Sequence, residues 1–141
     1  VALYAGAGPE ARWCAALARV RTTREVVGVC SLKHTADGDV EIGWHVFPPY
    51  QGRGYGKQMA AQLVDRAFQD REAARLVAHT APNAERATRI LRELDFERDG
   101  EAFNAADGRL WRWSLRRQNR SETAPRLLPM SRPAALLAVF L

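Results

Sequence analysis

Residues 46–57, which read VFPPYQGRGYGK, decide the fold of this chain. The two prolines end the strand that precedes them, because proline cannot donate to a β-ladder. Three glycines within five residues follow. Apolar residues then recur at the spacing of an amphipathic helix, at Met59, Ala60, Leu63, Val64, Ala67 and Phe68. The stretch therefore joins a strand to a helix through a glycine-rich loop.

This loop has the composition of an anion-binding site. Glycine lets the backbone approach a ligand closely and turn without a Cβ clash. The first turn of a helix leaves N–H groups unpaired, and the helix dipole makes that end partly positive. Together these features suit a pyrophosphate, and Arg53 and Lys57 add positive charge at the rim.

Two common phosphate loops do not fit. A P-loop needs four residues between its glycines and a Ser or Thr after the lysine, whereas Gln58 follows Lys57. The dinucleotide fingerprint needs Gly-x-Gly-x-x-Gly within a βαβ unit, and this loop has Gly-x-Gly-x-Gly. The pattern that fits is Gln/Arg-x-x-Gly-x-Gly/Ala, with Gln51, Gly54 and Gly56 at its fixed positions. An ordinary glycine-rich turn remains the alternative.

The flanking residues predict an α+β domain. The β-branched run 26–32 and the run 40–47 form a hairpin around an Asp-Gly turn, and residues 13–21 are ambiguous between strand and helix. After the first helix come a strand at 75–80 and a second helix at 84–94, which buries Ala87, Leu91 and Leu94. Strands at 97–101 and 109–115 close one mixed sheet flanked by the two helices.

Composition narrows the class of protein. The chain has 141 residues, 47% hydrophobic, which suits one globular domain. Its net charge of +5 suits an anionic partner, but the arginines are spread along the chain, so a nucleic-acid surface is the less favoured interpretation. Cys14 and Cys30 lie in apolar runs and form no disulfide framework. We expect a cytoplasmic protein with no metal site and no membrane partner.

From about Trp13 to Leu115 the chain resembles the GNAT superfamily of N-acetyltransferases, and more narrowly the ribosomal-protein N-terminal acetyltransferase branch. The residues that carry the resemblance are EIGWHV at 41–46, the glycine loop, and 87–96 after it. The resemblance implies acetyl-CoA as co-substrate and a primary amine as acceptor, on a small molecule or a protein N-terminus. The cofactor-binding residues that it implies are Val46, Phe47, Gln51, Gly52, Arg53, Gly54, Tyr55, Gly56, Lys57 and Asn83.

The resemblance and the changes in composition along the chain together predict the domain plan. We expect a short N-terminal segment at 1–12, the acetyltransferase domain at 13–116 and a loose tail at 117–141. The strand and helices that open the family fold are expected to be largely missing, which leaves the acceptor unidentified. Exposed strand edges and this short front are compatible with a homodimer.

The resemblance also implies catalytic residues. It implies a glutamate base at Glu41, for which an exposed strand carboxylate is the alternative. Strand alternation puts His45 on the same face, while His34 and His79 are interpreted as structural or surface residues. Backbone N–H groups near Val46 or Phe47 would meet the oxyanion. The hydroxyl that the family uses as an acid is absent, because Ala87 and Leu91 stand at its two usual positions. A CoA-binding module without catalysis is therefore the second hypothesis.

Overall fold

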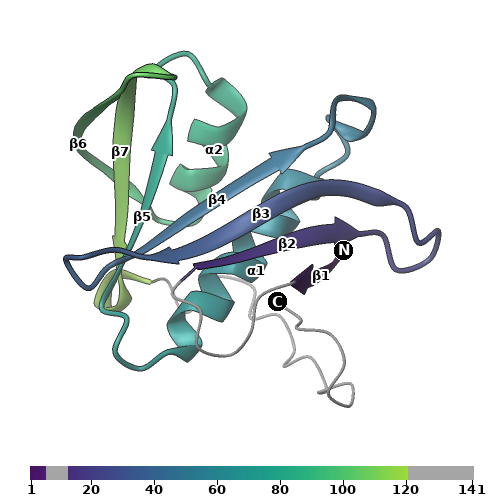
Figure 1. Cartoon of the computed structure of the whole chain (residues 1–141), viewed down its shortest axis with the longest axis horizontal. Coiled ribbons are helices and arrows are strands. Elements are labelled where there is room, and N and C mark those ends of the chain that lie inside the picture. The colour runs from purple at the N-terminus through teal and green to yellow at the C-terminus, as the bar shows by residue number, and fades with distance from the viewer. Residues whose placement is uncertain (6–12, 121–141) are drawn as a thin grey trace.

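A computed structural model describes residues 1–5 and 13–120 (Figure 1). Its elements are β1 (Ala2–Ala5), β2 (Trp13–Arg19), β3 (Val26–His34), β4 (Val40–Val46), the 3-10 turn η1 (Pro48–Tyr50), α1 (Tyr55–Gln69), β5 (Arg75–Thr80), α2 (Glu85–Glu93), β6 (Glu97–Asn104), β7 (Gly108–Arg116) and the 3-10 turn η2 (Arg117–Asn119).

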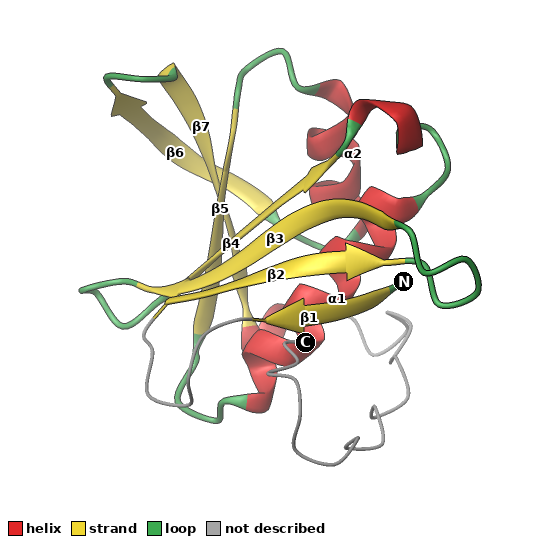
Figure 2. Cartoon of the chain, turned by 45° about the vertical axis from the view of Figure 1, so that its right-hand side comes forward, coloured by secondary structure: helices red, strands yellow, loops and turns green. Residues whose placement is uncertain are grey.

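The strands form one seven-stranded sheet in the order β1-β2-β3-β4-β5-β7-β6. Every neighbouring pair is antiparallel except β4 and β5, which are parallel. These two strands share only the partner pairs Val40↔Leu76 and Glu41↔Val77. Beyond Glu41 they diverge, as Figure 2 shows. The predicted mixed sheet is confirmed and is mostly antiparallel, and its centre is this fork between β4 and β5.

Both helices pack on one face of the sheet, which we call the helical face (Figure 2). All six apolar positions predicted for the first helix are buried in α1. They form a single core with residues of every strand from β2 to β5, of α2 and of β7. Within it the Trp113 indole N–H donates to the Thr80 hydroxyl at 3.0 Å. We call the other side of the sheet the opposite face.

The second helix differs from its prediction in one buried residue. Leu91 and Leu94 are buried as expected, but Ala87 is only half-buried and Thr88 is buried instead. The prediction of a buried Ala87 is therefore wrong, because the buried side of α2 includes Thr88 beside Leu91. Asp95 follows the helix with φ of 69°, the left-handed conformation in which a helix often ends.

The N-terminal strand that we expected to be missing is partly present. Residues 2–5 pair with β2 in an antiparallel ladder from Ala2↔Arg19 to Ala5↔Ala16. The Gln62 side-chain amide in α1 also donates to the Val1 carbonyl at 2.7 Å. The sequence did not predict this strand, because residues 1–12 are rich in Ala and Gly and have no clear period. The strand forms through its backbone pairing with β2. The ambiguous segment 13–21 is also a strand, so a meander precedes the fork.

The first part of the predicted tail packs on the domain. The Arg117 guanidinium donates to the main-chain carbonyls of Phe68 and Ala73 at 2.9 Å and of Asp70 at 2.6 Å, which caps the C-terminal end of α1. Residues 121–141 lie outside the described part. Within the described residues no helix is long and apolar enough to cross a membrane.

Candidate active site

The glycine loop leads into the N-terminus of α1, as predicted. Gly52 and Gly54 have φ of 79° and 83°, a conformation that costs other residues about 1–2 kcal/mol. Gly54 is the N-cap, no side chain caps the helix, and its first turn contains no acidic residue. The first N–H groups of α1 are therefore free to receive an anion. This arrangement fits the cradle that a pyrophosphate requires.

Gly56 serves a different purpose, because it lies where α1 meets β4 and α2. A Cβ atom there would stand 3.2 Å from Ile90 Cδ1, 3.5 Å from Trp44 Nε1 and 3.6 Å from a Val46 methyl carbon. The missing side chain thus lets the start of α1 approach the end of β4. This contact fixes the loop beside the fork.

The end of β4 presents main-chain groups to the fork. The Phe47 N–H donates to the Val27 carbonyl at 2.8 Å, and antiparallel pairing alternates, so the main-chain groups of Trp44 and Val46 point away from β3 and toward β5. Of the two predicted backbone contacts, Phe47 is therefore already bonded within the sheet, and its N–H is not available to a ligand. The Val46 carbonyl faces the opening, where it accepts the Gln51 side-chain amide at 2.9 Å.

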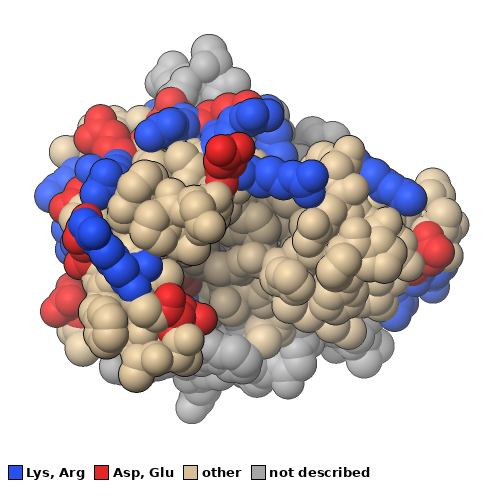
Figure 3. Space-filling view, turned by 90° about the horizontal axis from the view of Figure 1, so that it is seen from above, with Lys and Arg blue, Asp and Glu red and all other residues tan. Residues whose placement is uncertain are grey.

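Three basic side chains lie at or near the glycine loop. Arg53 lies over the Tyr50 ring at 5.9 Å, and Lys57 pairs with Glu93 at 2.9 Å. Arg86, which sequence reasoning missed, reaches from α2 to the Gln51 amide oxygen at 3.4 Å. The sequence does not reveal this contact, because Arg86 lies far from the glycine loop along the chain. Figure 3 shows the surface hollowed between two lobes at this end of the molecule, with basic and acidic side chains along one rim.

The two predicted catalytic residues share one face of β4, as expected, but their side chains have different partners. Glu41 and His45 lie on the opposite face of β4, as alternation requires, since Val40, Ile42, Trp44 and Val46 face the core. His45 is exposed, and its ring contacts Phe47 with centroids 6.0 Å apart. Glu41 instead bonds His79 on β5, with 2.9 Å between Oε1 and Nδ1. His79 was interpreted as a structural or surface residue, because the parallel pairing of β4 with β5 is invisible in the sequence.

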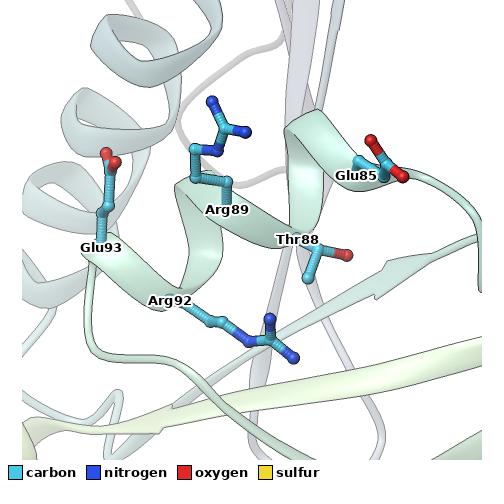
Figure 4. Close-up of a pocket in the computed structure, with 5 residues that line it drawn as sticks. All are labelled: Glu85, Thr88, Arg89, Arg92 and Glu93. Carbon is cyan, nitrogen blue, oxygen red and sulfur yellow. The ribbon is translucent and has the colours of Figure 1, made fainter.

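Helix α2 supplies no hydroxyl at the two positions expected for an acid. Leu91 is fully buried, and Asn83 lies exposed in the turn before the helix. Helix α2 lines a shallow pocket of about 370 Å³, with Glu85, Thr88, Arg89, Arg92 and Glu93. Figure 4 shows Arg89 and Glu93 pointing away from Thr88. This pocket includes neither the glycine loop nor Glu41. We therefore place the candidate active site at the fork instead, where the uncapped N-terminus of α1 lies next to the end of β4.

Comparison with known proteins agrees with this geometry. The family described as Acetyltransferase (GNAT) domain matches residues 2–97, more than half of the chain. The chain belongs to the GNAT acetyltransferase family. The uncharacterized N-acetyltransferase p20 of Bacillus licheniformis is 27% identical to this GNAT chain over 95 residues. That alignment covers 64% of this chain and 53% of p20, so the chain spans about half the length of that relative.

Solved GNAT structures share the fold. The aminoglycoside acetyltransferase AAC(6')-Ib in complex with coenzyme A and kanamycin superposes with a TM-score of 0.66 at 21% identity, covering 77% of this chain and 69% of that one. The ribosomal-protein-S5-alanine acetyltransferase of Vibrio fischeri superposes with a TM-score of 0.67 at 19% identity, covering 78% and 64%. At these identities the likeness concerns the GNAT fold alone.

Proposed function

We propose that this GNAT chain transfers an acetyl group from acetyl-CoA to a primary amine, on a small molecule or a protein N-terminus. The observation that carries the proposal is the uncapped N-terminus of α1, which Gly52 and Gly54 open beside the fork. Membership of the family supplies the reaction class. A pyrophosphate in the cradle would meet main-chain N–H groups and the charges of Arg53 and Lys57.

The pantetheine arm would then extend along β4. Its amides are suited to the main-chain groups that Trp44 and Val46 present to the fork, as an added strand would be. The side chain of Gln51 would have to leave the Val46 carbonyl, exchanging one hydrogen bond for another. The acetyl group would reach the part of the fork where β4 and β5 separate. There Val46, not Phe47, has a main-chain N–H directed at the opening.

Calorimetric titration with acetyl-CoA, and with desulfo-CoA as a non-reactive control, tests the cradle. We expect micromolar binding that weakens by roughly tenfold, about 1.4 kcal/mol, in Gly54→Ala. The matched control is Gly38→Ala in the turn between β3 and β4, because Gly38 has the same φ of 83° and equal room for a Cβ. Both variants share the backbone strain, so only the loss of a binding site separates them. Equal affinity in the two variants, or no binding by the folded chain, would refute the proposal.

The acceptor is tested separately. Release of CoA thiol is measured with kanamycin and with a peptide that begins with alanine, the acceptor classes named for two structural relatives. Turnover of either probe supports an enzyme and indicates its acceptor class. Binding of acetyl-CoA without turnover of either supports the second candidate, a CoA-binding module, which the absence of a hydroxyl at Ala87 and Leu91 favours.

A further inference from the structure

The pair formed by Glu41 and His79 stands where the fork begins. Glu41 belongs to the last partner pair of β4 and β5, and His79 lies two residues beyond its partner Val77. The side-chain bond of 2.9 Å between Glu41 and His79 therefore joins the two strands just where their main-chain pairing stops. The pair therefore lies at the closed end of the fork, on the opposite face of the sheet.

The direction of this bond fixes the state of the imidazole. A carboxylate can only accept, so His79 must donate through Nδ1–H. A neutral ring then has its lone pair on Nε2. Nε2 has no hydrogen-bond partner among the residues that the structure describes, and the His79 side chain is 24% exposed. Glu41 thus holds a histidine with its basic nitrogen unengaged.

The neighbouring carboxylates on this side of the sheet pair with arginines, whereas Glu41 bonds His79. Arg112 lies opposite His79 in the ladder of β5 with β7, and its guanidinium is 3.5 Å from Asp99 and 3.8 Å from Asp39. Asp39 in turn accepts two hydrogen bonds from Arg75, at 2.6 and 3.0 Å, the larger reason why the pKa of Arg75 is raised. Lys33 faces Glu41 from β3.

We propose that His79 is the proton-transfer residue of this acetyltransferase, acting through Nε2, and that Glu41 is a positioning residue that fixes its tautomer. The inference rests on the proposed function. Nε2 takes the proton that the acceptor nitrogen loses as the N–C bond forms. The C–S bond then breaks, and the imidazolium returns the proton to the leaving thiolate. One proton moves from nitrogen to sulfur, so the balance needs no further acid.

A histidine suits this reaction better than a glutamate base for two chemical reasons. An imidazole ordinarily titrates nearer to neutral pH than a carboxylate, and a base works best close to the operating pH. A histidine can also serve as the acid of the second step. Ala87 and Leu91 stand at the positions where the family usually has a hydroxyl acid. With His79 as the acid, the reaction still has a proton donor.

The tautomer can be measured without any acceptor. In the full chain labelled with ¹⁵N-histidine, long-range ¹H–¹⁵N spectra distinguish a ring protonated on Nδ1 from one protonated on Nε2. We expect His79 to show the Nδ1–H form, and the exposed His34 to show the Nε2–H form that predominates in water. Glu41→Ala should shift His79 toward the pattern of His34. An Nε2–H tautomer in the unaltered protein would overturn the proposal.

Kinetics with the probe amine that turns over supply the second test. His79→Asn keeps a donor for Glu41 but has no counterpart of Nε2, and we expect kcat to fall about 10²-fold or more. Affinity for acetyl-CoA and KM for the amine should change less than about twofold. Glu41→Gln should lower kcat by less than His79→Asn does. The matched control is His34→Asn, on β3 and exposed, with unchanged kcat.

The outcomes separate the two proposals. If the unaltered chain does not bind acetyl-CoA, the proposed function is refuted, whichever tautomer His79 has. Intact binding with a wild-type kcat in His79→Asn refutes only the role of His79. A larger loss in Glu41→Gln than in His79→Asn would return the role of base to the carboxylate.

Discussion

The two faces of the sheet are stabilised by different forces. The helical face is covered by α1 and α2, and its contacts are almost all apolar. The opposite face has charged side chains at its centre, where Asp39, Arg75 and Arg112 lie beside the pair formed by Glu41 and His79. Apolar packing follows from the period of each element, whereas the ion pairs join residues on different strands. The packing of the helical face can therefore be predicted from the sequence, whereas the ion pairs of the opposite face cannot.

One substitution made on both faces should show the largest difference. Leu63 in α1 is fully buried, while Leu17 on β2 is 45% exposed on the opposite face. We expect Leu63→Ala to lower the free energy of unfolding by about 3 kcal/mol, because it leaves a cavity in the core. Leu17→Ala should lower it by less than about 0.5 kcal/mol. Urea unfolding of both variants measures the contrast, and equal losses would contradict it.

The central ion pair of the opposite face should have the next largest effect. Asp39 is buried and accepts two hydrogen bonds from Arg75, which is itself partly exposed. Asp39→Asn should cost about 2 kcal/mol, less than a fully buried pair because water screens Arg75. Asp37→Asn, two residues away and exposed, is the matched control. If the two variants unfold at the same urea concentration, the ion pair does not stabilise this face.

A polar contact inside the helical face tests the comparison from the other direction. Thr80→Val would leave the buried Trp113 indole N–H without its acceptor, and should cost about 1–2 kcal/mol in urea unfolding. Thr22→Val, at an exposed turn position, should be nearly neutral. A neutral result for Thr80→Val would mean that the packing of the indole alone determines stability there.

The smallest effect is expected at the outer edge of the sheet. Hydrogen bonds from Arg109 are the main reason why the pKa of Glu101 lies below its usual value. A lowered pKa stabilises the fold above the unfolded value, and the contribution is lost as the pH falls through the folded value. In Arg109→Gln, the carboxyl shift of Glu101 followed by NMR should titrate at higher pH than in the unaltered chain. An unchanged midpoint would assign the lowering to Arg98.

The elements closest to the glycine loop could be predicted almost completely. The period of residues 59–68 identifies the buried face of α1, and the glycines identify its open N-terminus. Strand β1 could not be predicted, because four residues of Ala2–Ala5 carry no period and depend on pairing with β2. His79 and Arg86 could not be assigned either, because each acquires its partner from an element far away in sequence. Asn83 and the loop contacts remain predictions.

The fork also creates an edge strand in the middle of a sheet. From Ile42 to Val46, β4 has no strand beside it on the β5 side among the described residues. Such an edge ordinarily invites another chain to add a strand, which leads to self-association. Here the edge is recessed between two lobes, and the Gln51 amide occupies the Val46 carbonyl at its mouth. If pantetheine binds along this edge as we propose, the ligand also occupies the main-chain groups that would otherwise pair with another chain.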